Sequence, residues 1–118
     1  MQYVYPAVFY SAVEGGYFID FPDVEGAFTQ AENLYEALER AEDALNAMLM
    51  TYEDFKAGRF ELPMKNRIVE PTPIEKVVAE SGEYSTSAFV TLIKADTDAY
   101  RKLLAENKTK NDTSTGAA

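Results

Sequence analysis

Four carboxylates in the first half of the chain, Asp20, Asp23, Glu36 and Asp43, are the residues that could carry catalytic chemistry. Carboxylates that converge from strand and helix ends can hold two Mg²⁺ ions, as they do in metal-dependent nucleases. The first expected strand, residues 7–13, contributes no carboxylate to such a cluster. The sequence therefore favours a solvated acidic surface, and we expect no catalytic residue and no metal.

Two residue types that carry much of enzyme chemistry are absent from the chain, because it contains no cysteine and no histidine. Their absence excludes thiol nucleophiles, disulfides, catalytic triads that contain histidine, and the usual zinc ligand sets. We expect a protein that is not an enzyme and has no cofactor.

Acidic residues are concentrated in the first half of the chain. The formal net charge is −9, of which residues 1–60 carry −8. Nucleic acids would be repelled by such a surface, whereas a basic protein partner would be attracted and steered towards it. The alternative is that the acidity serves only solubility.

These acids must be positioned by the elements that the first 31 residues predict. We expect a strand over residues 7–13, a turn at Glu14-Gly15-Gly16 and a second strand over 17–21, which together form a β-hairpin. A break at residues 22–26 precedes a third, short antiparallel strand over 27–31.

A long helix should follow. Asn33 and Glu36 have the spacing of a capping box, so the helix should begin there and fray around Thr51. Apolar residues at helical spacing should face the sheet, and they are Leu34, Leu38, Ala41, Leu45, Met48 or Leu49, and Tyr52. The acids that fall outside this stripe are Glu36, Glu39, Glu42 and Asp43. They form either a partner-binding surface or a plain solvated helix face.

The rest of the chain predicts a connection, a strand and a helix. Prolines indicate a long connection over residues 58–85, with a short helix from Pro73 to about residue 79. A fourth strand over 86–95 precedes a helix over 99–107, with Tyr100, Leu103 and Leu104 on its inner side. We therefore expect an α+β domain over residues 1–107 and a disordered polar tail over 108–118. We expect the long helix to cross over the sheet and the fourth strand to lie parallel to the first, which would satisfy the right-handed crossover rule.

The segment between the second and third strands has a specific turn pattern. Its structural residues are Phe21, Pro22, Asp23, Gly26 and Phe28. Proline presets φ, aspartate caps and glycine takes positive φ, which predicts a β-turn. The same loop could contact a partner, and we include Asp20 and Asp23 with the four helix acids as candidate partner-binding residues.

Aromatic side chains are frequent in the same half of the chain. They are Tyr3, Tyr5, Phe9, Tyr10, Tyr17, Phe18, Phe21 and Phe28. Stacking platforms for bases are accompanied by basic grooves, which this half lacks, so we expect core and interface packing. Strand alternation should leave Tyr17 or Phe18 exposed as a candidate for self-association.

Several sequence words together resemble the HicB family of antitoxins over residues 1–105. They are Tyr5-Pro6-Ala7-Val8-Phe9, the segment from Tyr17 to Gln30 with its Phe-Pro-Asp-x-x-Gly core, Glu36-Ala37-Leu38-Glu39-Arg40-Ala41, and the stretch from Phe89 to Asp96. The resemblance implies a partial RNase H-like fold. It also implies that the chain neutralises a small basic HicA toxin, an mRNA-cleaving ribonuclease with a double-stranded-RNA-binding-like fold.

The sequence departs from the family pattern after Leu104. Many family members continue into a helix-turn-helix or ribbon-helix-helix domain that binds their own promoter. Here no second apolar helix and no basic strand follow, which argues against promoter binding by this chain. We expect a cytoplasmic homo-oligomer, a dimer or larger, with no membrane span. The alternatives are a stand-alone RNase H-like nucleic-acid-binding or nuclease module, or a transcriptional regulator that acts through a partner.

Overall fold

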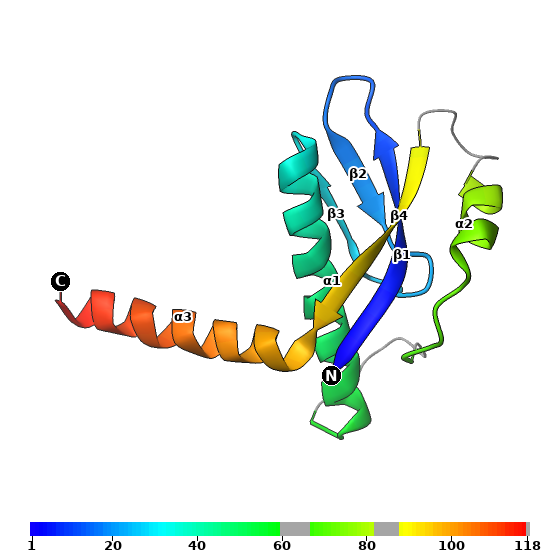
Figure 1. Cartoon of the computed structure of the whole chain (residues 1–118). Coiled ribbons are helices and arrows are strands. Elements are labelled where there is room, and N and C mark those ends of the chain that lie inside the picture. The colour runs from blue at the N-terminus through cyan, green and yellow to red at the C-terminus, as the bar shows by residue number, and fades with distance from the viewer. Residues whose placement is uncertain (60–66, 82–87, 118) are drawn as a thin grey trace.

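A computed structural model describes residues 1–59, 67–81 and 88–117, with side chains described up to residue 107 (Figure 1). The elements, in chain order, are β1 (Gln2–Ser11), β2 (Tyr17–Asp20), β3 (Phe28–Ala31), α1 (Leu34–Lys56), α2 (Ile74–Ser81), β4 (Ala88–Asp96) and α3 (Thr97–Ala117). None of the helices in the described part of the chain combines the length and the apolar character that a membrane span requires.

The four strands form one sheet in the order β3-β2-β1-β4. The expected antiparallel arrangement of the first three strands is confirmed. The predicted direction of the fourth strand was wrong, because β4 pairs antiparallel with β1 from Gln2 opposite Asp96 to Tyr10 opposite Ala88. Every neighbouring pair in this sheet is therefore antiparallel.

The connection between α1 and β4 explains the direction of β4. Helix α1 ends near the N-terminus of β1, and a strand that started there would run parallel to β1. Instead, the chain returns past α2 to the opposite end of the sheet before β4 begins (Figure 1). The connection is long enough to span the sheet, so the crossover rule for parallel strands does not apply.

β1 is longer than the predicted strand, since it starts at Gln2 and includes Pro6. A proline is tolerated there because β2 pairs only with Val8 to Ser11, so among the described strands the first half of β1 has β4 as its single neighbour. In a strand with one neighbour, every second backbone N–H makes no hydrogen bond to another strand, so a proline, which has no N–H, can occupy such a position.

Two consecutive tight turns join β2 to β3. The N–H of Val24 donates to the Phe21 carbonyl at 3.1 Å, and the N–H of Ala27 donates to the Val24 carbonyl at 3.0 Å. Gly26 has φ +91°, and a Cβ at this position would lie 2.9 Å from the sulfur of Met48. The predicted turn is thus confirmed, and its glycine is needed for the positive φ, whereas a Cβ there would require only that the flexible Met48 side chain move aside.

α1 begins as predicted, with the Asn33 side chain accepting from the N–H of Glu36 at 2.8 Å. It runs to Lys56 rather than fraying near Thr51. The predicted apolar stripe was partly wrong, because Leu34 and Leu38 are 45% and 43% exposed. The buried side chains of α1 are Ala37, Ala41, Leu45, Asn46, Leu49 and Tyr52. The two alanines let the first turns of the helix lie close to the sheet, which leaves the larger leucines to one side.

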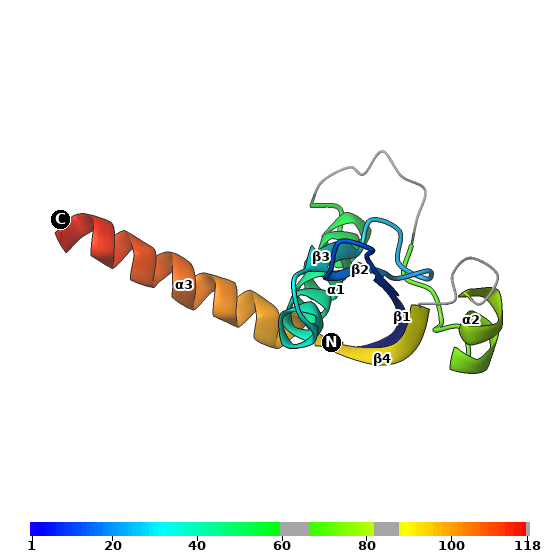
Figure 2. The same ribbon diagram turned by 90° about the horizontal axis from the view of Figure 1, so that it is seen from above.

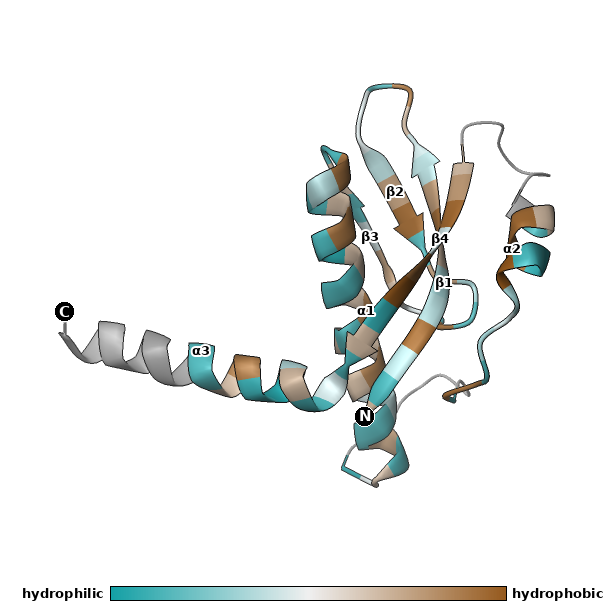
Figure 3. Ribbon diagram, in the orientation of Figure 1, coloured by the Kyte–Doolittle hydropathy of each residue, from teal (hydrophilic) through white to brown (hydrophobic). Residues whose placement is uncertain are grey.

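The main core lies between α1 and the sheet face formed by the odd-numbered residues of β1. Tyr5, Ala7 and Phe9 of β1 pack there with Ile19 of β2 and Ile93 of β4. Figure 3 shows the corresponding hydrophobic stretches along β2 and the centre of β4. α1 therefore packs on the odd-numbered side chains of β1.

α2 lies on the opposite side of the sheet from α1 (Figure 2). It contacts β4 and β1, and its Val77 is 2% exposed, as is Val8 of β1. The short helix was predicted, and its bounds are Ile74–Ser81. Among the described helices, α2 therefore covers the second face of the sheet, and it does so over β1 and β4.

α3 projects away from the body of the domain (Figure 1). Asp96 caps it, since its carboxylate accepts from the N–H of Ala99 at 3.1 Å. Tyr100 and Leu103 lie on the side that faces α1, as predicted, but Leu103 is 51% exposed, and the predicted inner position of Leu104, which is 40% exposed, was wrong. The helix runs to Ala117, ten residues beyond the predicted end. The division into a domain over residues 1–107 and a disordered tail over 108–118 stays a prediction.

The carboxylate of Glu53 joins three elements at the base of the sheet. It accepts from the Tyr3 hydroxyl of β1 at 2.6 Å, from the Thr97 hydroxyl at 2.8 Å and from the Arg101 guanidinium of α3 at 3.1 Å. Arg101 also pairs with Asp54 at 2.8 Å. Burial would raise the pKa of Glu53, but the hydrogen bonds from Tyr3, Thr97 and Arg101 lower it overall.

We expect Glu53→Gln to destabilise the fold by about 1–3 kcal/mol at neutral pH, because partly buried donors lose a charged acceptor. The depressed pKa means that Glu53 contributes its full stabilisation above its unfolded value of 4.5 and loses it as the pH falls through the lower, folded value. Urea denaturation at a series of pH values should show the difference between wild type and variant shrinking below that point. Glu80→Gln, which removes an exposed carboxylate of α2, should change stability by less than about 0.5 kcal/mol. A pH-independent difference for Glu53→Gln would contradict the prediction.

Candidate protein-binding surfaces

Three of the six predicted partner-binding acids lie together on α1. Glu39, Glu42 and Asp43 line a shallow groove of about 310 Å³ between α1 and α3, with Tyr100 and Leu103 of α3 on its other side. The groove exists because α3 leaves the sheet at an angle to α1. Its carboxylates are exposed or at the rim, so they present negative charge to solvent.

The polar groups within this groove are partly engaged by the fold. Burial raises the pKa of the Tyr100 hydroxyl, and a hydrogen bond to Asp43 adds to the increase. The Asn46 amide donates to the Glu42 carbonyl at 3.0 Å, while its Oδ1 has no partner among the described residues. That oxygen has no accessible surface, so an incoming side chain could not reach it without a rearrangement.

The fourth helix acid, Glu36, is already paired. Its carboxylate lies 2.5 Å from the Arg40 guanidinium, one turn further along α1. Arg40 also donates to the Gln30 carbonyl of β3 at 2.9 Å. Glu36 therefore orients Arg40, which joins the start of α1 to the edge of the sheet. In a capping box its carboxylate would instead accept from the backbone N–H of Asn33.

Asp23, which sequence reasoning placed in a contact loop, holds two distant segments together. Its two carboxylate oxygens accept from the backbone N–H of Thr72 at 2.8 Å and from the Thr72 hydroxyl at 2.6 Å. These bonds fix the connection that leads into α2 against the turn after β2. The structure thus gives Asp23 a structural role, and its contact with a partner stays a prediction.

Asp20 lies on β2, on the sheet face away from α1. It stands opposite Val8 of β1 and Phe28 of β3. Burial raises the pKa of its carboxyl, and only a backbone hydrogen bond from Phe21 opposes this effect. The six predicted acids are thus divided among the α1 groove, the start of α1, the turn and the far face of the sheet.

Sequence reasoning missed a row of aromatic side chains on that far face. Phe18 lies 6.3 Å from Tyr10 and 6.3 Å from Phe28, measured between ring centroids. Phe28, predicted to be structural, is 60% exposed, while Phe21 is buried. Phe18 is the exposed member of the Tyr17 and Phe18 pair, as the alternation allowed.

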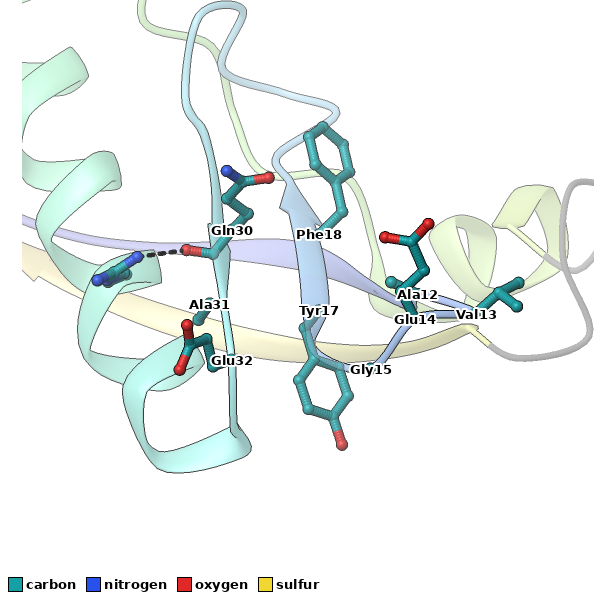
Figure 4. Close-up of a pocket in the computed structure, with 10 residues that line it drawn as sticks. Ala12, Val13, Glu14, Gly15, Tyr17, Phe18, Gln30, Ala31 and Glu32 are labelled. Atoms are coloured by element: carbon teal, nitrogen blue, oxygen red, sulfur yellow. Dashed lines mark hydrogen bonds between the residues drawn. The ribbon is translucent and has the colours of Figure 1, made fainter.

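A hollow of about 500 Å³ lies beside this row, at the hairpin end of the sheet. Figure 4 shows Phe18 and Tyr17 projecting to opposite sides of β2, with Gln30 on the neighbouring strand β3 and Glu32 directly after it. The hollow is open and mixed in character, with Glu14 and Glu32 at its rim. Among the described residues, no group of three or more acidic side chains is placed to hold a metal ion.

The sequence is similar to those of HicB antitoxins. Antitoxin HicB 1 of Photorhabdus laumondii subsp. laumondii is 47% identical over 51 residues, which cover 42% of this chain and 33% of that antitoxin. Antitoxin HicB of Escherichia coli K12 is 49% identical over 41 residues, covering 35% of this chain and 30% of that antitoxin. The match thus spans about a third of the length of these relatives. No protein-family model matches the sequence.

Solved structures show the same fold. The N-terminal domain of the Burkholderia pseudomallei antitoxin HicB matches with a TM-score of 0.59 and 19% identity, covering 80% of this chain and 99% of that one. A chain of a toxin–antitoxin complex from Streptococcus pneumoniae matches with a TM-score of 0.50 and 26% identity, covering 85% and 73%.

The chain is therefore a small mixed α/β domain of the kind found at the N-terminus of HicB. In sequence and in fold it resembles HicB antitoxins, so the resemblance predicted from its sequence words is confirmed.

Proposed function

We propose that this chain is a non-enzymatic antitoxin that binds and neutralises a small basic ribonuclease toxin of the HicA type. The observation that carries the proposal is the 47% identity to a HicB antitoxin over 51 residues. The fold supports it, because a similar fold, with a TM-score of 0.57, occurs in a HicA3 and HicB3 toxin-antitoxin complex.

The charge of the chain supports the same partner. A net charge of −9 attracts a basic protein and repels RNA. We assign the exposed acids Glu39, Glu42 and Asp43 to steering, since exposed charges act mainly on the rate of encounter. Affinity in such a complex comes mostly from buried aromatic and apolar contacts.

Coexpression tests the proposal directly. The chain should restore growth to cells that express the HicA-like protein from the neighbouring reading frame, and the two purified proteins should elute together from gel filtration. Absence of both rescue and a complex would overturn the proposal. Mg²⁺-dependent RNA cleavage by the isolated chain would overturn it in favour of a nuclease.

We expect the triple variant Glu39→Gln, Glu42→Gln, Asp43→Asn to slow association with the toxin about 3- to 10-fold at low salt, because it removes three steering charges. The effect should vanish as salt rises, since screening shortens the reach of exposed charges. The dissociation rate should not change. Surface plasmon resonance over a salt series measures both rates.

The matched control for this variant keeps the charges, as Glu39→Asp, Glu42→Asp, Asp43→Glu. Its association rate should equal that of the wild type at every salt concentration. A slower rate for the control, or a faster dissociation rate for the neutral variant, would show that the helix acids act by direct contact instead of by steering.

We further propose that the chain is a homo-oligomer that pairs through β4. Among the described strands, β4 is an edge strand with β1 as its single neighbour. Two β4 strands paired antiparallel about Leu92 would place Phe89 opposite Ala95 and Val90 opposite Lys94, with no like charges facing each other.

Leu92→Lys should shift such a dimer to the monomer, because it places two lysines opposite each other on the two-fold axis. Light scattering after gel filtration at micromolar concentration measures the mass. Val78→Lys, on the exposed side of α2, is the control and should leave the mass unchanged. A monomeric wild-type chain, or a Leu92→Lys variant that remains dimeric, would contradict pairing through β4.

A further inference from the structure

The sheet face opposite α1 carries a partly exposed aromatic surface on β1, β2 and β3. We call Tyr10, Phe18 and Phe28 the aromatic row. Phe18 and Phe28 are 44% and 60% exposed, and Tyr10 is partly exposed. Each ring centroid lies 6.3 Å from that of the next ring in the row. Such spacing is within the range of favourable ring contacts, so the three rings form one continuous apolar surface.

Strand register produces the aromatic row. Tyr10 stands opposite Phe18, and Asp20, two residues further along β2, stands opposite Phe28. Residues two apart in one strand share a face, so Phe18 and Asp20 point to the same side as Tyr10 and Phe28. α2 lies on this side of the sheet too, and among the described elements its main contacts are with β4 and β1, not with β2 and β3.

Asp20 gives this surface its charge. Directly opposite residues have Cβ atoms about 4.5–5.5 Å apart, so the side chains of Asp20 and Phe28 leave the sheet next to each other. No described ion pair involves Asp20. Lys94 shares the face but stands opposite Val4, four residues along β1 from the partner of Asp20, or about 13 Å at strand spacing. Partial burial raises the pKa of the Asp20 carboxyl, because burial disfavours the charged form. A cation that approached the carboxylate would favour the charged form and offset this effect.

We propose that the aromatic row and Asp20 form the anchoring site for an arginine side chain of the basic toxin. A guanidinium stacks on aromatic faces and at the same time donates two parallel hydrogen bonds to a carboxylate. Arginine and aromatic residues are also the side chains that dominate the energy of protein interfaces. The inference rests on the proposed function, because it requires a basic protein partner.

Other occupants fit this surface less well. Stacking alone would suit the bases of single-stranded RNA, but such sites combine aromatic rings with a basic groove, and here the nearest charge is a carboxylate. A second copy of this chain carries a net charge of −9 and would bring like charge to Asp20. Charge complementarity therefore selects a cationic protein.

The experiment measures binding of the full chain to a catalytically inactive form of the HicA-like protein encoded beside it. Phe18→Ser and Asp20→Asn should each raise the dissociation rate about 10- to 100-fold, the range expected for anchor residues. Association rates should stay within about threefold of the wild type, because one anchor changes the encounter little. Circular dichroism melting checks that both variants fold.

Tyr35→Ser is the matched control, because it removes an aromatic side chain of 78% exposure from the start of α1, on the other side of the sheet. Its dissociation rate should equal that of the wild type. In addition, mutating arginines of the toxin one at a time to alanine should identify one whose loss is not additive with Asp20→Asn.

The possible results separate this inference from the proposed function. Failure of the wild-type chain to bind the toxin overturns both. Binding that Phe18→Ser and Asp20→Asn leave unchanged overturns the anchoring site alone. A change in the mass of the isolated chain on Phe18→Ser, with toxin binding intact, would assign the surface to a second copy. RNA binding that Phe18→Ser abolishes, with toxin binding intact, would assign it to a nucleic acid, and either result overturns the inference.

Discussion

The hydrogen bonds of the Glu53 carboxylate are the constraint on which the rest of the structure depends. They join β1 through Tyr3, the start of α3 through Thr97 and the body of α3 through Arg101. The N–H of Thr97 also donates to the Met1 carbonyl at 3.0 Å. A single side chain of α1 thus ties together the first residues of β1 and the first turns of α3, which follows directly on β4. The groove between α1 and α3 exists because of that arrangement.

Local chemistry allowed much of the fold to be predicted from the sequence. The hairpin, the turn at Gly26 and the start of α1 at Asn33 depend on residues within a few positions of one another. The direction of β4 could not be predicted, because it depends on the path of a connection about thirty residues long. The buried side of α1 was partly mispredicted because hydrophobicity favoured Leu34 and Leu38, whereas close packing on the sheet favoured the smaller Ala37 and Ala41.

The candidate surfaces could likewise be predicted where they depend on residues close in sequence, and could not where they depend on distant ones. Helical spacing alone placed Glu39, Glu42 and Asp43 on one exposed side of α1, and the structure places them together. The role of Asp23 was hidden, because its partner Thr72 is 49 residues away. The aromatic row was also hidden, since it takes one residue from each of three strands. Alternation identified Phe18 as a candidate for exposure, but only the register shows which rings are its neighbours.

The two candidate surfaces lie on opposite sides of the sheet, and this separation has a physical consequence. Exposed charges act over a Debye length of about 8 Å at physiological salt and about 30 Å in dilute buffer, whereas ring stacking and a paired carboxylate act only on contact. In the proposed complex, the acids of α1 would therefore attract a basic partner without touching it, while the aromatic row would determine how long the partner stays. Because the two effects act on different rate constants, an antitoxin of this design could change its association rate by substitutions on α1 without losing the contacts that hold the complex together.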